Sequence, residues 1–320
     1  ARHNLSMRVA WLGTFNSLPD FPHWKGIREA VKKLHPDHLL LDYYQLSDDE
    51  IVRRLNEYAP EAVVHTLTDS VARNLIKRSP PCRQVMWYCD YTFFHKGFDN
   101  PLKGDTGLNT LLLCTEDQIH LYKERLGIED VQFLPMASIP DLDPHFSRTK
   151  EQCVTPMFEG SMAEDGIYAD RTNLVRSIKA KVPELQVIPL PHGAGSYRLE
   201  SAQEARRALC TLSISAINKA SLYTSPRLFQ IVLQGGLPLV KRFPGLELMF
   251  PECVAVESFE VEEWARKIEM VRHNFDAMES LRHRMLEHAL LWHTYEQRIK
   301  ELMDILCGRP LSSIIFAVKS

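Results

Sequence analysis

The sequence predicts an α/β protein with two Rossmann-like, doubly wound parallel-sheet domains that face a central cleft. Short apolar, strand-like runs alternate with helical stretches in both halves of the chain. A stretch rich in proline and aspartate, residues 139–152, separates the two alternating sets and is typical of a linker. The 320 residues are enough to form two hydrophobic cores. We therefore expect one domain over residues 1–138 and a second over residues 153–290.

The first half shows the repeated β–α units of a parallel sheet. Its expected strands are 7–12, 38–43, 62–66, 84–89, 110–114 and 131–134. Its expected helices are 24–34, 48–58, 71–78 and 116–126. Acidic residues in the first turn of 48–58 suit the helix dipole, Pro80 and Pro81 stop the third helix, and Gly127 closes the fourth.

The second half repeats the alternation. Its expected strands are 154–158, 185–188, 211–214, 237–240 and 254–256. Its expected helices are 170–181, 202–208, 225–234 and 261–274, followed by a mainly helical region over 275–306. In the third of these helices, Ser225 is the expected N-cap and Pro226 the first helical residue, while Gly235 and Gly236 end it.

Composition limits the class of protein. The net charge of −3 argues against a dedicated nucleic-acid binder, although a local basic patch stays possible. Seven cysteines without CxxC spacing indicate free thiols in a reducing cytosol, and no zinc site. No apolar run approaches the length of a membrane span, and no signal peptide is visible. We expect a cytoplasmic protein without integral membrane association.

The helix that starts near Ser225 points to a ligand class. Its N-terminal end combines backbone N–H groups, the Ser225 hydroxyl and the Arg227 guanidinium. Helix N-termini favour anions, and the planar guanidinium can hold two phosphate oxygens. This segment therefore suits a diphosphate.

Four segments carry a family resemblance: Ser225-Pro226-Arg227-Leu228-Phe229-Gln230, Phe243-Pro244-Gly245-Leu246-Glu247-Leu248-Met249-Phe250-Pro251, His293-Thr294-Tyr295-Glu296-Gln297-Arg298 and Phe133-Leu134-Pro135-Met136-Ala137-Ser138. Together they resemble GT-B glycosyltransferases, in particular the CgeB-like, spore-maturation-protein-like group of the glycosyltransferase 1/4 superfamily. The resemblance covers roughly residues 110–305 and thins towards the N-terminus. It implies a nucleotide-sugar donor, most simply a UDP- or GDP-sugar, no tightly bound cofactor and no required metal. It also implies that residues 291–320 form a helix and tail that cross back to the N-terminal domain.

Two positions depart from the family pattern. Gln230 stands where the family usually has the glutamate that holds the ribose hydroxyls. Leu222 stands where many retaining relatives have the first glutamate of an E-x7-E pair. An amide can still donate and accept hydrogen bonds, so donor binding can survive with altered selectivity. The stereochemical outcome is left open.

Ligands of open α/β sheets bind beyond the carboxyl ends of the strands, which selects the candidate site residues. The expected donor-binding residues are Gly13, Thr14, Gly160, Ser161, Arg171, Tyr223, Ser225, Arg227 and Gln230. The expected catalytic residues, which would take a proton from the acceptor hydroxyl, are Asp90, Asp20 and His23. His65, at the end of a strand, and His95 are weaker candidates for the same role.

The resemblance implies a glycosyltransferase, of the hexosyl or pentosyl type, that moves a sugar from a nucleotide sugar to an unidentified acceptor. A small molecule, a glycan, a protein or a modified DNA base is each open as acceptor. One alternative is a DNA-modifying glycosyltransferase that acts on a hydroxymethylated base. Another is a non-catalytic binding protein built on a degenerate GT-B fold.

Overall fold

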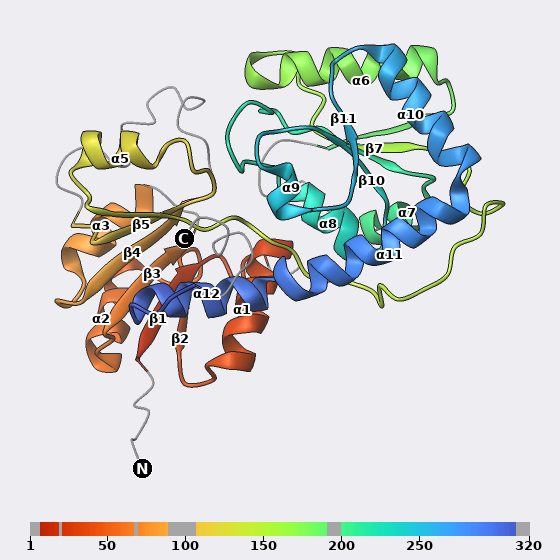
Figure 1. The fold of residues 1–320 in the computed structure, drawn as a ribbon. Helices are drawn as coiled ribbons and strands as arrows, with labels where there is room; N and C mark the ends of the chain where they lie inside the picture. Colours follow the sequence, from red (N-terminus) through yellow and green to blue (C-terminus); the bar gives the residue numbers. More distant parts are fainter. Residues whose placement is uncertain (1–6, 19–20, 67–69, 89–106, 191–199, 312–320) are drawn as a thin grey trace. The chain divides into compact units, whose positions relative to one another are not determined.

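The computed structural model describes residues 7–18, 21–66, 70–88, 107–190 and 200–311. Its contacts divide the chain into two compact units. The N-terminal unit comprises residues 1–135 and Arg298–Pro310, and the C-terminal unit contains Met136–Gln297. Both are parallel-sheet α/β units (Figure 1).

The N-terminal unit is built on a six-stranded parallel sheet with the order β2-β1-β3-β4-β5-β6. Its strands are β1 (Val9–Gly13), β2 (Leu39–Asp42), β3 (Ala62–Thr66), β4 (Arg83–Tyr88), β5 (Thr110–Leu113) and β6 (Asp130–Phe133). Its helices are α1 (Pro22–Leu34), α2 (Asp48–Tyr58), α3 (Ser70–Arg78), α5 (Ile119–Leu126) and most of α12 (Tyr295–Leu306). Every residue of β1 and β3 is buried, as expected for central strands covered on both faces.

Helix α12 is held to the N-terminal sheet by two arginines. The fully buried Arg298 donates from Nε to the carbonyl of Pro135 over 2.9 Å. Arg83, at the start of β4, donates from Nη1 to the carbonyl of Leu306 in the last turn of α12 over 3.0 Å. Residues 298–310, although distant in sequence, therefore belong to the N-terminal unit and are hydrogen-bonded to it.

The C-terminal unit is built on a five-stranded parallel sheet with the order β11-β10-β9-β7-β8. Its strands are β7 (Met157–Gly160), β8 (Gln186–Pro189), β9 (Thr211–Ser213), β10 (Pro238–Lys241) and β11 (Val254–Val256). Its helices are α6 (Ala169–Lys181), α7 (Ser201–Arg207), α8 (Arg227–Leu233), α9 (Leu246–Met249), α10 (Val261–His273) and α11 (Phe275–Trp292), with a 3-10 turn at Gly166–Tyr168. Helices α6 and α10 pack together on one face of this sheet, and α8 and α11 on the other (Figure 1).

Several expected boundaries need correction. The strand expected at 154–158 is Met157–Gly160, because Pro156 lacks the N–H that a ladder needs and Val154 is exposed. The helix expected to begin at residue 116 begins at Ile119. Helix α8 begins at Arg227 with Pro226 as its N-cap, so Ser225, the expected N-cap, lies one residue before the observed one. The helical region after residue 275 is two helices, separated at His293 and Thr294.

Candidate functional site

Both sheets change winding direction at an equivalent point. In each sheet, the first strand in sequence has the second strand on one side and the third strand on the other. The change falls between β1 and β3 in the N-terminal unit, and between β7 and β9 in the C-terminal unit. Ligands of doubly wound sheets bind beyond the carboxyl ends of the strands at this point. Each unit therefore has a defined edge at which a site is expected.

Arg227 lies at the C-terminal unit's switch point. Its guanidinium Nη1 is 3.0 Å from the position that a Cβ atom on Gly160 would occupy, so the side chain lies directly against the end of β7. Among the residues that the structure describes, the Arg227 guanidinium has no hydrogen bond or ion pair. Burial lowers the pKa of Arg227, and the charges of Glu159 and Tyr168 oppose that shift. The guanidinium stays charged and keeps its donors for a ligand.

Helix α8 presents Arg227 and Gln230 on the same side. The other five residues of the helix are buried, whereas these two are half-buried. Residues three apart are neighbours on a helix surface, so the amide and the guanidinium share the open face. Leu222, by contrast, is 1% exposed in a left-handed conformation (φ 56°) and donates its N–H to the carbonyl of Pro244. A carboxylate at position 222 would enter the core.

Arg171 supplies a second guanidinium near Arg227. It lies in the first turn of α6, is 4% exposed, and donates from Nη2 to the carbonyl of Ser161 over 2.6 Å. Its Nε has no hydrogen-bond partner among the described residues. Its Cζ lies 4.9 Å from the centre of the Tyr168 ring. Burial, and then the charge of Arg227, lower the pKa of Arg171 to about 10. Arg171 therefore holds the Ser161 loop and adds a second positive charge.

The segment before α8 is fixed by hydroxyl groups. The backbone N–H of Ser225 donates to Ser215 Oγ over 3.0 Å, and the N–H of Arg227 lies 3.4 Å from Ser225 Oγ. Ser215 follows β9, so it ties the approach to α8 to the neighbouring strand. Tyr223 is half-buried and lies near enough to Arg171 to raise the pKa of that guanidinium electrostatically. The structure thus brings together Gly160, Ser161, Arg171, Tyr223, Ser225, Arg227 and Gln230 within one unit.

Two residues of this site were not predicted from the sequence. Ser215 orients the turn before α8, as described above. Glu159 is the last residue but one of β7, is 8% exposed, and accepts a hydrogen bond from Ser201. It also acts electrostatically on Arg227. The sequence did offer a signal for Glu159, because it is a carboxylate directly before Gly160 and next to a predicted strand. That strand was expected to end at residue 158, so Glu159 was assigned to the following loop.

The N-terminal unit fixes its β1–α1 loop with a buried carboxylate. Asp42, 2% exposed at the end of β2, accepts the N–H groups of Asn16 and Ser17 over 2.8 and 3.0 Å, and the Ser17 hydroxyl over 2.7 Å. It also accepts the N–H of Tyr44 over 2.9 Å. Burial raises the pKa of Asp42, but these hydrogen bonds outweigh burial and hold the pKa below its usual value. The sequence-based site did not include this residue.

The end of β1 and the loop that follows it contain two of the expected site residues. Gly13 allows close packing, because a Cβ atom there would lie 2.5 Å from Thr66 Oγ1 and 2.8 Å from the Phe15 ring. Thr14 is 3% exposed, and its Oγ1 has no hydrogen-bond partner among the described residues. Both residues lie in the N-terminal unit, whereas the residues gathered around Arg227 lie in the C-terminal unit.

The expected catalytic residues are placed only in part. Asp20, Asp90 and His95 lie outside the described residues. His23, the second residue of α1, is buried, and burial lowers its pKa to about 4.

His65 is fully buried between Tyr43 and Gln84, with ring-nitrogen contacts of 3.0 and 2.9 Å. His65 therefore belongs to a core hydrogen-bond network, and its burial explains a pKa of about 4.

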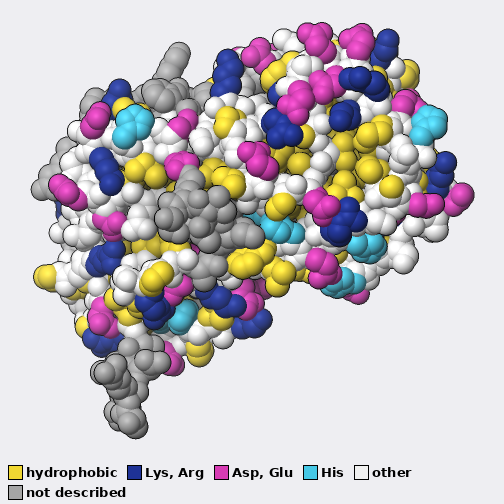
Figure 2. Space-filling view, in the orientation of Figure 1, with side chains coloured by type: hydrophobic (Ala, Val, Ile, Leu, Met, Phe, Trp, Pro, Cys, Tyr) yellow, Lys and Arg dark blue, Asp and Glu magenta, His cyan; other side chains and the backbone are white. Residues whose placement is uncertain are grey.

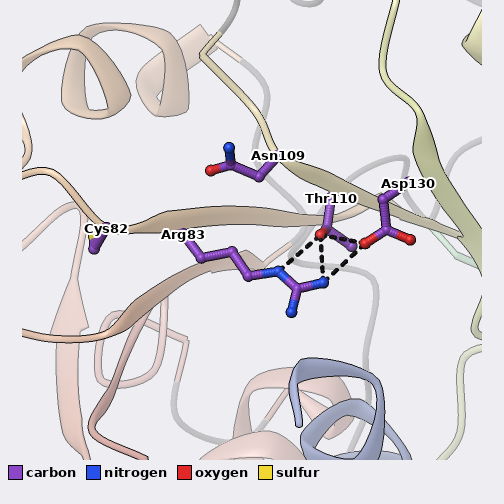
Figure 3. Close-up of a pocket in the computed structure, with 5 residues that line it drawn as sticks. All are labelled: Cys82, Arg83, Asn109, Thr110 and Asp130. Atoms are coloured by element: carbon purple, nitrogen blue, oxygen red, sulfur yellow. Dashed lines mark hydrogen bonds and ion pairs between the residues drawn. The ribbon is translucent and has the colours of Figure 1, made fainter. Parts of the chain in front are cut away.

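The N-terminal unit has a pocket of about 500 Å³ at the amino ends of β4, β5 and β6 (Figure 3). This edge of the sheet is opposite the carboxyl ends of the strands, where a ligand is expected. Arg83 donates from Nη2 to Thr110 Oγ1 and to Asp130 over 2.9 and 2.8 Å, and Thr110 donates to the same carboxylate over 2.6 Å. Burial raises the pKa of Asp130, but hydrogen bonds from Thr110, Gln132 and Arg83 outweigh it and lower the pKa. These groups satisfy one another, which fits a structural role.

Within the described ranges, no group of three or more His, Cys, Asp or Glu side chains is arranged to hold a metal ion. In the same ranges, no helix is long and apolar enough to span a bilayer.

Comparisons with solved structures define the fold. The N-terminal domain of Candida albicans trehalose-6-phosphate phosphatase has a TM-score of 0.65 at 10% identity, covering 96% of this chain and 97% of that one. A structure described as trehalose-6-phosphate from E. coli bound with UDP-2-fluoro glucose has a TM-score of 0.61 at 10% identity, covering 93% and 98%. T4 phage BGT in complex with UDP and Mn²⁺ has a TM-score of 0.56 at 11% identity, covering 93% and 100%. The fold is GT-B.

A family comparison adds to this assignment. Residues 173–304 match a family model described as Glycosyl transferase-like, and this stretch contains Arg227 and Gln230. No curated protein sequence matches the chain. The match covers less than half of the chain, and the solved structures, at 10–11% identity, show the fold alone.

Proposed function

We propose that this protein is a glycosyltransferase that binds a nucleotide sugar in its C-terminal unit and transfers the sugar to an acceptor hydroxyl. One observation carries the proposal: the Arg227 guanidinium lies against Gly160 at the switch point without a hydrogen bond or ion pair to a described residue. Arg171 adds a second positive charge beside it. A diphosphate supplies the negative charge and the oxygen acceptors that such a pair lacks.

The comparisons support the same reading of the site. The matched family segment, residues 173–304, contains α8 and α11 and begins within α6, after Arg171. Two of the fold neighbours were solved with UDP or with UDP-2-fluoro glucose. We therefore propose a UDP- or GDP-sugar as donor, with its diphosphate at Arg227 and its ribose at Gln230. The CgeB-like subgroup and a hexosyl or pentosyl class remain part of this proposal.

The proposed reaction breaks the bond between the anomeric carbon and the diphosphate oxygen and forms a bond from that carbon to the acceptor oxygen. The nucleoside diphosphate leaves with an additional negative charge, and the acceptor proton passes to a base. Arg227 and Arg171 would stabilise the charge that develops on the leaving group. Cations that are already in position, and partly shielded from water, stabilise a developing negative charge more than solvent does. His23, Asp20 and Asp90 remain the proposed bases.

A thermal-shift screen with UDP-, GDP-, ADP- and CMP-sugars tests the donor class. A ligand that binds only the folded protein adds about 2.7 kcal/mol to the free energy of unfolding at 100 times its Kd. For a chain of this length, that raises Tm by several degrees. We expect a UDP- or GDP-sugar to produce this shift. If none of the four raises Tm, the proposed donor site is wrong.

A donor-only hydrolysis assay then separates an enzyme from the non-catalytic alternative. Slow release of nucleoside diphosphate from the bound donor is the expected result. Binding without any release, even with candidate acceptor sugars present, would favour a binding protein on the same fold.

A further inference from the structure

A second polar pocket, of about 600 Å³, lies in the C-terminal unit away from Arg227. Its lining residues are Leu142, Phe146, Ser147, Arg148, Gln152, Cys153, Gln203, Arg206 and Arg207. These segments directly precede β7 and β9, which begin at Met157 and Thr211. Because the strands are parallel, the pocket is at the amino edge of the sheet, opposite the edge where Gly160 and Arg227 meet. It is therefore separate from the proposed donor site.

The inner wall of this pocket is preformed by a buried charge network. Arg148 pairs with Glu279, and its Nη1 donates to the carbonyl of Ala208 over 2.7 Å. Glu279 also pairs with the fully buried Arg282 over 3.0 Å. The Phe146 ring lies 4.3 Å from Arg206 Cζ and 5.0 Å from Arg282 Cζ. Arg148 is thus already committed to a carboxylate and helps to shape the pocket.

Arg206 and Arg207, in the last turn of α7, bring positive charge to the pocket. Neither makes an ion pair with a described residue, although the Asp143 carboxylate acts electrostatically on Arg206. Arg206 donates to the backbone carbonyls of Gln234 and Asp143, which are neutral acceptors. Arg207 is exposed and makes no hydrogen bond or ion pair among the described residues, and the same holds for the exposed side chain of Gln203. The nine lining residues contain no aspartate or glutamate.

We propose that this pocket is a second binding site, for a small phosphate-bearing anion. Donors for phosphate oxygens come from Arg207, from the Gln203 amide and from Nη1 of Arg206, which donates to no described residue. The volume of about 600 Å³ is that of a small-molecule site. Arg206 also joins the pocket to α8, because it holds the carbonyl of Gln234, the C-cap of that helix, over 3.1 Å.

Calorimetric titration with pyrophosphate at constant ionic strength tests this site, with inorganic phosphate in a second series. The Arg227→Ala variant is the starting protein, since it lacks the proposed donor diphosphate contact. We expect it to retain one pyrophosphate site. Adding Arg207→Ala should weaken that site about tenfold or more, the usual effect of losing a charged hydrogen bond. Tighter binding of pyrophosphate than of phosphate would indicate that the pocket contacts two phosphate groups. Equal binding of the two anions would indicate that it contacts one.

The matched control is Arg266→Ala, an exposed arginine in the middle of α10 that does not line the pocket. It should leave pyrophosphate binding unchanged. The proposal is overturned if Arg227→Ala alone abolishes pyrophosphate binding, or if Arg207→Ala and Arg266→Ala weaken it equally. The two proposals fail separately: binding that is insensitive to Arg227→Ala but lost with Arg207→Ala would remove the donor site and keep this one.

Discussion

The guanidinium of Arg227 lies against the backbone of Gly160, with Nη1 3.0 Å and Cζ 3.2 Å from where a Cβ atom on that glycine would be. This contact joins the start of α8 to the end of β7 at the point where the sheet changes direction. It fixes the position of a charged group that has no carboxylate bonded to it among the described residues. The proposed donor site depends on this arrangement.

Gly160→Ala should displace Arg227, because the added methyl group would also lie 2.9 Å from the Phe158 ring and cannot be accommodated without movement. We expect UDP affinity to fall about tenfold, which corresponds to partial loss of a charged hydrogen bond. Calorimetry measures this. Met162→Ala, in the same loop but outside the proposed donor site, is the control for general disturbance of the loop. Equal affinities for wild type and Gly160→Ala would show that Arg227 does not need this contact.

Gln230→Glu should bind a UDP- or GDP-sugar as tightly as wild type or more tightly. Position 230 shares the open face of α8 with Arg227, and a carboxylate accepts hydrogen bonds from ribose hydroxyls more strongly than an amide does. Parallel titrations of wild type and variant with the same donor check this. Loss of binding in Gln230→Glu would mean that the amide N–H groups are needed and that this helix is used differently.

Asp42→Asn should loosen the β1–α1 loop and lower the free energy of unfolding by about 1–3 kcal/mol at pH 7, the usual range for unsatisfied buried donors. The folded-state pKa of Asp42 lies below its usual value, so its carboxylate stabilises the fold above about pH 4 and loses that effect as the pH falls. Urea unfolding across this pH range should show that the difference in free energy of unfolding between variant and wild type becomes smaller in acid. A gap that is independent of pH would contradict a charged Asp42.

Acid should destabilise the N-terminal unit through its buried histidines. His23 and His65 have folded-state pKa values of about 4, against about 6.5 in the unfolded chain. Between these values the unfolded state binds more protons, so the free energy of unfolding falls as the pH drops from 6.5 towards 4. The two groups together give a slope of at most about 3 kcal/mol per pH unit. His65→Gln should make the measured slope shallower, and an unchanged slope would show that His65 is not the group that titrates.

Arg83→Ala should destabilise the fold more than removal of a surface arginine. It removes the bond to Leu306 in α12 and the pair with Asp130, and charged hydrogen bonds of this kind are worth about 1.5–3 kcal/mol. The matched control is Arg78→Ala, which breaks an exposed pair with Asp49 and should cost below about 1 kcal/mol. Urea unfolding compares them. Similar losses would indicate that the Arg83 network does not anchor α12.

The sequence predicted the alternation of strands and helices well, because buried parallel strands are short apolar runs and the breaks carry glycine or proline. Arg227 and Gln230 were recognisable because they share one local helix with a family resemblance. Glu159, Ser215 and Asp42 were not, since their contacts depend on which strands are neighbours. Asp42 reaches the loop after β1 only because the sheet order places β2 beside β1. Such non-local pairing is not encoded in the spacing of residues along the chain.

The central claim is that Arg227 binds the diphosphate of a nucleotide sugar, and titration of UDP into wild type, Arg227→Ala and Arg266→Ala tests it most directly. The account predicts that Arg227→Ala weakens UDP binding by at least tenfold while its circular dichroism spectrum and unfolding midpoint stay close to those of wild type. Arg266→Ala should bind UDP as wild type does. A folded Arg227→Ala protein with unchanged UDP affinity would contradict the account.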